Sequence, residues 1–201
     1  MWYACREKGG IFLEADILLW IQNSLRSDFL TPLMRFVTML GDKGWFFILT
    51  AFILLVIPKT RKIGFACALA LILHLLAVNL LLKPLFFRVR PYDAIIELEN
   101  LVGIQPDGSF PSGHAAASFA VSTVLLLRGK KALSIPMTVL AVAISFSRLY
   151  VGVHYPTDVL AGAAVGILFG FIAVRITDRV WESFCSFLKK GTEKLFGRKK
   201  E

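Results

Sequence analysis

Five long apolar stretches constrain the fold of this chain more than any other feature of its sequence. They cover residues of roughly 45–58, 64–82, 113–127, 132–150 and 157–174. A helix needs about 20 apolar residues to cross the hydrocarbon of a bilayer, and slightly fewer where its ends reach toward water. Because the stretches run continuously and do not alternate, they predict helices and not barrel strands. We therefore expect an all-α, polytopic transmembrane helix bundle in which residues 1–201 form one integral-membrane domain.

Composition excludes the main alternatives to this fold class. The chain is 56% hydrophobic with a mean hydropathy of +0.67, which is too apolar for a soluble domain. The net charge of +9 would suit nucleic acid only on a soluble basic face, so no nucleic-acid partner is expected. The three cysteines lie far apart, which predicts neither a disulfide framework nor a metal site. The first ten residues lack the apolar core of a secretory signal, so no removable signal peptide is expected.

The distribution of lysine and arginine predicts an orientation in the membrane. Of the 23 basic residues, 14 fall in the segments 59–62 and 128–131 and after Val174. Counting alternate crossings places these segments on one face, which the positive-inside rule makes cytoplasmic. The loops on the opposite, external face are then 41–44, 83–112 and 151–156. We therefore expect a multi-pass protein of the cell membrane with a cytoplasmic C-terminus.

The two ends of the chain differ from the five apolar stretches. In the N-terminal segment 1–40, charges interrupt the apolar residues of 11–40 at helical spacing; they are Glu14, Asp16, Arg26, Asp28 and Arg35. Each would cost about 3 kcal/mol at the centre of a bilayer, so two amphipathic interfacial helices with a break near 27–32 are expected. A tilted crossing that faces protein, as a sixth span, is the alternative. The basic tail at 176–201 is expected to lie along the cytoplasmic leaflet.

The first of three polar motifs is KPLFFRVRP at residues 83–91. Lys83 and Arg90 are seven residues apart, which is nearly two turns of a helix, so the two side chains would share one face. Two fixed cations suit the oxygens of a phosphate, the arginine as a planar fork and the lysine as a point charge. Arg88 is expected to be an interfacial anchor.

The second motif is PSGH at residues 111–114, directly before an apolar stretch. Ser112 can cap the helix that follows, whose first N–H groups and positive dipole end then form an anion site. Gly113 permits a close approach to that site, and His114 would lie beside it. A capped span with an interfacial histidine is the structural alternative.

The third motif is SRLYVGVHYPTD at residues 147–158, which contains Arg148. Pro156 suits the first turn of the last span, which places Asp158 just inside that span and close to His154. A carboxylate beside an imidazole fixes the tautomer and stabilises positive charge on the ring, as a nucleophilic histidine requires. The alternative is an ion pair that holds a loop.

In this order, the three motifs resemble the signature motifs of the type 2 phosphatidic acid phosphatase superfamily, which also includes vanadium-dependent haloperoxidases. The resemblance extends from Lys83 to Asp158. It implies a helical bundle, commonly of six spans in membrane members, and a phosphatase that acts on membrane lipids. It also implies that the reaction needs no metal and no other cofactor.

The resemblance further implies a role for each motif residue. His154 would attack phosphorus and become phosphorylated, with Asp158 orienting its ring. His114 would protonate the leaving oxygen and then activate the water that hydrolyses the phosphohistidine. The equatorial oxygens would be held by Lys83, Arg90, Ser112, Gly113 and Arg148.

The expected substrate is a lipid phosphate whose head group lies at the external membrane surface, in contact with membrane lipids. Undecaprenyl diphosphate is favoured, with phosphatidylglycerophosphate and phosphatidate as close alternatives. From other functional classes, a non-catalytic lipid-phosphate-binding protein and a haloperoxidase with bound vanadate are the competing hypotheses.

Two further polar residues, His74 and Asn79, lie in the second apolar stretch. Hydrogen bonding between helices is the expected role of both. Asn79 is one turn before Lys83 and could also position that lysine.

Overall fold

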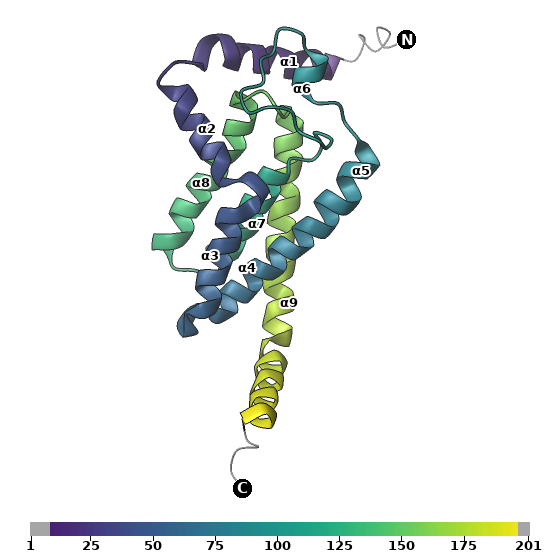
Figure 1. Ribbon diagram of the computed structural model, residues 1–201. Helices are drawn as coiled ribbons and strands as arrows, with labels where there is room; N and C mark the ends of the chain where they lie inside the picture. Colours follow the sequence, from purple (N-terminus) through teal and green to yellow (C-terminus); the bar gives the residue numbers. More distant parts are fainter. Residues whose placement is uncertain (1–8, 197–201) are drawn as a thin grey trace.

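The computed structural model describes residues 9–196. This part of the chain contains thirteen helical segments, joined by loops, and no strand (Figure 1). Residues 1–8 and 197–201 of the two predicted terminal segments lie outside the described residues. With η denoting a π- or 3-10 helix, the elements are α1 (Gly9–Trp20), η2 (Ile21–Leu25), α2 (Leu30–Leu40), η3 (Asp42–Gly44), α3 (Trp45–Val56), η4 (Pro58–Thr60), α4 (Arg61–His74), η5 (Leu75–Leu82), α5 (Lys83–Phe86), α6 (Pro91–Ala94), α7 (Gly113–Arg128), α8 (Lys131–Tyr150) and α9 (Pro156–Phe196).

The long apolar helices confirm the predicted transmembrane bundle. By length and composition, three helical stretches can cross a membrane, namely Pro58–Ala94, Lys131–Tyr150 and Pro156–Ser183. The predicted stretch at 45–58 corresponds to α3, whose 12 residues are too few to cross alone. Helices α2 and α3 pass the same test together, as a pair bent by 45°. Helix α7 is apolar but has only 16 residues.

The bend between α2 and α3 packs against the His114 side chain at the start of α7. Lys43 and Gly44 have positive φ angles of 51° and 68°, so the chain turns sharply here. Just before them, a Cβ atom added to Gly41 would lie 2.6 Å from Cδ2 of His114. A larger residue here would have to displace the His114 ring, so glycine lets η3 lie directly against the start of α7.

The N-terminal segment breaks where the sequence predicts, but only its first half lies outside the bundle. Helix α1 lies across one end of the bundle, and the chain turns at residues 26–29 (Figure 1). Helix α2 packs against α8 instead, and its Thr38 is buried. Its Arg35 is exposed, and α2 passes the span test only together with α3. The choice between a second interfacial helix and part of a tilted span therefore stays a prediction.

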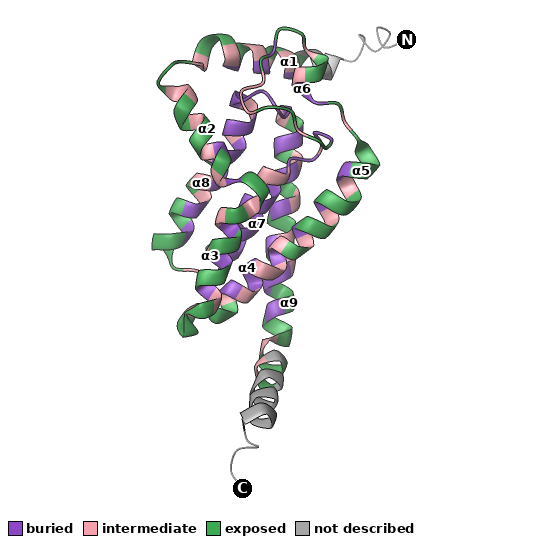
Figure 2. Cartoon of the chain, in the orientation of Figure 1, coloured by how far each residue is buried: buried purple, intermediate pink, exposed green. Residues whose placement is uncertain are grey.

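Helix α7 is the centre of the bundle, with buried residues along most of its length (Figure 2). It packs against α4, α8 and α9. The contact with α9 depends on Gly162, Gly166 and Gly170, which repeat every four residues. A Cβ atom on Gly166 would overlap the carbonyl oxygen of Ala116 in α7. Small residues at this spacing allow two helix backbones to approach closely in a membrane.

The three predicted basic segments meet at the end of the bundle opposite α1. Asp178 of α9 forms ion pairs with Lys62, at 2.9 Å, and with Arg128. Helix α9 is continuous through Arg175 and does not end near 174 as the predicted span does. The tail therefore prolongs the last span along its axis, and its position on a leaflet stays a prediction.

Candidate active site

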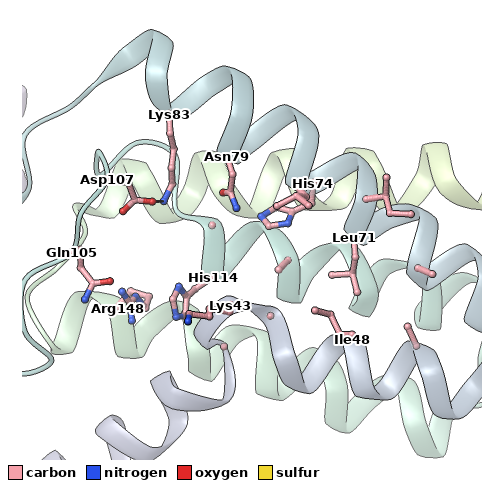
Figure 3. A pocket seen from close by; sticks show the side chains of 18 of the residues that line it. Lys43, Ile48, Leu71, His74, Asn79, Lys83, Gln105, Asp107, His114 and Arg148 are labelled. Carbon is pink, nitrogen blue, oxygen red and sulfur yellow. Dashed lines mark hydrogen bonds and ion pairs between the residues drawn. The ribbon is translucent and has the colours of Figure 1, made fainter.

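A cavity of about 780 Å³ opens between α3, the α4–η5–α5 stretch and the start of α7. One end is polar and is lined by Lys83, Arg90, His114, Arg148 and His154. The other end is apolar and runs between α3 and α4, past Ile48, Phe52, Leu71, Ile72 and Leu75. Figure 3 shows the charged side chains gathered at one end and the aliphatic ones at the other. The cavity thus has the two-part character of a phospholipid, a charged head and an apolar chain.

His154 lies at the polar end and is almost fully buried. Its Nε2 is 3.5 Å from a terminal nitrogen of Arg90, and its Nδ1 is 3.5 Å from Oδ2 of Asp158. Burial lowers the pKa of His154 well below the ordinary value, and the positive charges of Arg148, Arg90 and Lys83 lower it further. The ring is therefore neutral at physiological pH, as a nucleophile must be.

Asp158 is held in place by contacts other than the one to His154. Its Oδ2 accepts the backbone N–H of Tyr155 at 2.9 Å, and its Oδ1 accepts from Arg88 at 2.6 Å. Arg88 also donates to Glu14 of α1 at 2.5 Å and lies over the Tyr155 ring, with Cζ 3.9 Å from the ring centroid. The prediction of Arg88 as an interfacial anchor is wrong, because its guanidinium binds the carboxylate behind the candidate nucleophile.

Glu14 connects α1 to the first turn of α9 through hydrogen bonds. Its Oε1 accepts from the backbone N–H of Thr157 at 3.0 Å and from the Thr157 hydroxyl at 2.5 Å. Glu14 is buried, although the sequence places it among the charges expected to face water or lipid head groups. Helix α1 is therefore joined to the site through the chain of contacts from Glu14 to Arg88 to Asp158.

His114 occupies the opposite wall, in the first turn of α7. Its Nε2 lies 2.9 Å from Oδ1 of Asp42, in η3 at the bend between α2 and α3. The side chain of Asp42 is 56% exposed, whereas that of Asp158 is fully buried. Each of the two histidines at the site thus has its own carboxylate, from a different part of the chain.

Lys83 and Arg90 converge on one acidic side chain. Both bind the carboxylate of Asp107, Arg90 at 2.6 Å, and Arg90 also donates to the Val153 carbonyl at 2.9 Å. The helix expected to align the two cations is not present, because α5 ends at Phe86 and residues 87–90 are not helical. Although partial burial acts in the opposite direction, hydrogen bonds and charge from Lys83 and Arg90 hold the pKa of Asp107 below its ordinary value.

Arg148 and the start of α7 complete the polar end. The Arg148 guanidinium is buried, donates to the Thr38 hydroxyl at 2.6 Å and leaves its Nε without a partner among the described residues. Ser112 caps α7 as predicted, accepting the backbone N–H of Ala115 at 3.5 Å. The Ser112 backbone N–H donates to the Asp158 carbonyl at 2.9 Å, which fixes the second motif to the third.

The eight predicted site residues are therefore brought to one place. Six of them line the cavity: Lys83, Arg90, Gly113, His114, Arg148 and His154. The other two, Ser112 and Asp158, lie directly behind this wall. Sequence reasoning missed Glu14 and Asp42 as partners of the site. Their signal was a carboxylate within or beside an otherwise apolar helix, which is costly unless it is paired.

His74 and Asn79 also line the cavity, at the level of Gly113. The Nε2 atom of His74 is buried and has no hydrogen-bond partner within the described part of the chain. The ring nevertheless has a backbone hydrogen-bond contact with Gly113 of α7, so its predicted role between helices stays a prediction, and the ring also faces the cavity (Figure 3).

Comparison with known proteins agrees with this geometry. Residues 59–182 match the PAP2 superfamily. The undecaprenyl-diphosphatase BcrC of Bacillus subtilis is 33% identical over 132 residues, covering 60% of this chain and 67% of that protein. An undecaprenyl-diphosphatase of Sulfolobus acidocaldarius is 33% identical over 147 residues, covering 73% and 70%. The crystal structure of a transmembrane PAP2 type phosphatidylglycerolphosphate phosphatase from Bacillus subtilis has a TM-score of 0.70 at 26% identity, covering 88% of this chain and 90% of that one. This chain therefore belongs to the PAP2 superfamily of membrane lipid phosphatases.

Proposed function

We propose that this enzyme removes the terminal phosphate of a membrane lipid through a phosphohistidine on His154, and that its substrate is undecaprenyl diphosphate. The observation that carries the proposal is the cavity, which joins two histidines and three cations to an apolar channel. Its volume of about 780 Å³ suits a head group with the first part of a chain. The undecaprenyl-diphosphatases among the relatives support the choice of lipid.

In the first step, Nε2 of His154 attacks phosphorus. Nδ1 lies on the side of Asp158 and carries the proton, which leaves the lone pair of Nε2 directed toward Arg90 and the cavity. The N–P bond forms, the bond from phosphorus to the leaving oxygen breaks, and its electron pair stays on that oxygen. The gap of 3.5 Å between ring and carboxylate closes as positive charge develops on the imidazole.

His114 supplies the proton to the leaving oxygen. The reverse transfer occurs in the second step, when His114 takes a proton from water and the oxygen of that water attacks the phosphohistidine. Phosphate leaves and His154 returns to its neutral form. Asp42 holds the His114 ring in place for both transfers, through its contact at 2.9 Å.

Three cations stabilise the charge that spreads over the phosphoryl oxygens. Arg90 and Arg148 offer planar forks and Lys83 offers a point charge, and the N–H groups of the first turn of α7 point to the same place. In this structure Asp107 forms ion pairs with Lys83 and Arg90. Its side chain is nearly half exposed, so it can turn aside when a phosphate with more oxygens enters.

The test is a kinetic comparison with protein purified in detergent. We expect phosphate release in EDTA, inhibition by vanadate and an acid-labile phosphoprotein that is absent from His154→Gln. The rate constants should rank undecaprenyl diphosphate above undecaprenyl phosphate, phosphatidylglycerophosphate and phosphatidate. A strict requirement for Mg²⁺ would refute the mechanism. A preference for a glycerolipid phosphate would refute undecaprenyl diphosphate as the substrate.

The proposal places the site on the external face and the C-terminus in the cytoplasm. It rests on the basic end formed by Lys62, Arg128 and their neighbours, which is opposite the end that carries α1 and α6 (Figure 1). Reporter fusions after residue 60 and at residue 201 should both report a cytoplasmic location. A cytoplasmic signal from a reporter in the loop 92–110 would reverse this orientation.

A further inference from the structure

The helix that carries Lys83 is not a regular α-helix over the residues before it. Leu75–Leu82 form a π-helix of eight residues, η5, between α4 and α5. Such helices are rare, usually cover a single turn and occur often at functional sites. Here the irregular segment lies on the wall of the cavity, with Leu75 and Asn79 among the lining residues.

The π-helix changes which side chains share a face. His74 and Lys83 are nine residues apart, which on a regular α-helix is about two and a half turns, so the two side chains would point in opposite directions. In a π-helix the hydrogen bonds run from i to i+5, so residues four or five apart lie on one face. His74, Asn79 and Lys83 are spaced five and four residues apart and all point into the cavity (Figure 3).

These three side chains converge on Gly113 at the start of α7. The position that a Cβ atom of Gly113 would take lies 3.5 Å from Oδ1 of Asn79, 3.8 Å from Nε2 of His74 and 3.8 Å from Nζ of Lys83. His74 is only 8% exposed, and its Nε2 is buried without a partner in the described part of the chain. The ring has a backbone contact with Gly113, and a buried polar nitrogen at the wall of a cavity is available to a water molecule or to a polar group of a ligand.

The place of His74 and Asn79 along the cavity identifies the ligand group. In Figure 3 they stand between the charged end, with Arg148 and His114, and the aliphatic end, with Leu71. A lipid whose terminal phosphate lies at the charged end and whose chain lies at the aliphatic end must place its linking group between them. In a lipid diphosphate that group is a second phosphate.

We propose that His74 and Asn79 bind the phosphate that remains on the lipid, and so select a diphosphate over a phosphate monoester. This inference rests on the proposed function. An imidazole N–H from Nε2 and the amide N–H of Asn79 are both suitable donors to that phosphate. When the P–O bond of the anhydride breaks, the electron pair stays on the bridging oxygen of the lipid phosphate, whose added charge these donors stabilise.

The test compares two substrates that share one chain, farnesyl diphosphate and farnesyl phosphate, in detergent. The quantity measured is the ratio of their kcat/KM values. His74→Leu and Asn79→Leu should each lower this ratio about tenfold, as expected for one lost hydrogen bond to a charged group. His74→Gln keeps a donor and should retain most of the ratio. Leu80→Ala, an exposed neighbour outside the cavity, is the matched control and should leave it unchanged.

A second measurement covers variants with low activity. The methylene analogue of farnesyl diphosphate should lose about tenfold in affinity in His74→Leu, again as one hydrogen bond to a charged group predicts, while vanadate binds as before. Equal losses for both substrates, or for analogue and vanadate, would overturn the inference and leave the phosphatase intact. A wild-type enzyme that hydrolyses farnesyl phosphate but not farnesyl diphosphate would also overturn the inference and leave the phosphatase function intact. Phosphate release from neither lipid would instead refute the proposed function itself.

Discussion

Under the proposed mechanism, replacing Asp42 by asparagine should slow the enzyme, because it removes a negative charge that favours the protonated form of His114. The substitution keeps the size of the side chain and a possible hydrogen bond at the position of the 2.9 Å contact. It removes the negative charge that favours the protonated ring, and an asparagine can also present its N–H₂ group, which stabilises the wrong tautomer. We therefore expect a lower kcat, with little change in KM, because Asp42 does not line the cavity proposed to hold the substrate.

The size of the effect follows from the exposure of the pair. A hydrogen bond to a charged group contributes about 1.5–3 kcal/mol. The Asp42 side chain is 56% exposed, so solvent screening reduces this to the lower end, about 1.4 kcal/mol or a factor of roughly ten in rate. The same substitution at Asp158, whose side chain is fully buried, should cost far more, up to about 10⁴-fold by analogy with catalytic triads.

The assay uses leaving groups of different acidity. An alkoxide leaving group, as from farnesyl phosphate, needs a proton in the transition state, whereas p-nitrophenolate leaves without one. Asp42→Asn should therefore slow hydrolysis of farnesyl phosphate about tenfold, the estimate for one screened hydrogen bond, and change that of p-nitrophenyl phosphate much less.

The control is Asp28→Asn, an exposed carboxylate in the turn before α2, which should behave as wild type with both substrates. Equal slowing of the two substrates by Asp42→Asn would show that Asp42 supports the fold and not proton transfer. Full activity on farnesyl phosphate would show that His114 needs no orienting carboxylate. Either result would refute the assignment.

Three other predictions concern charge, packing and pH. Asp107→Asn frees the two cations that it now binds, so vanadate should inhibit at a concentration about threefold lower, a modest gain because the carboxylate is nearly half exposed. Gly166→Leu should abolish accumulation of folded protein, because any side chain there meets the Ala116 carbonyl, whereas Ala164→Leu on the exposed face of α9 should be tolerated. The lowered pKa of His154 means that the unfolded chain takes up a proton that the folded ring excludes, so the free energy of unfolding should fall by up to about 1.4 kcal/mol per unit as the pH drops below about 6.5. Melting curves at about pH 7.5, 6.5 and 5.5 should show that His154→Gln loses this part of the slope.

The position of the site could be predicted from the sequence because its main residues lie at helix ends. Ser112 caps α7 and Asp158 lies in the first turn of α9, so each motif places a capping or charged group where an apolar stretch begins. Apolar length fixes where a span starts, and alternate crossings bring the starts of α7 and α9 to the same end of the bundle. The local sequence pattern therefore predicts which residues lie at the same end of the bundle, but it does not predict which hydrogen bonds and ion pairs they form.

The partners of these residues could not be predicted, because they depend on tertiary packing. Asp42 reaches His114 only through the bend at Gly41, and Glu14 reaches Arg88 only because α1 lies across the end of the bundle. The orientation of His74 depends on a π-helix, for which the sequence has no known signal. In each case a polar side chain in an apolar setting marked the residue, and the fold alone determined what surrounds it.

The different surroundings of the two histidines support their roles without reference to any motif. His154 is 2% exposed and its carboxylate is fully buried, whereas His114 is 17% exposed and its carboxylate faces the open side of the bend. A nucleophile benefits from a dry site, where its charge after attack is stabilised by a fixed partner. An acid that later becomes the base for water must exchange protons with solvent, so it must lie where water reaches it. In the proposed mechanism, burial and the carboxylate that each one meets would therefore assign two imidazoles of the same intrinsic chemistry to the two steps of the reaction.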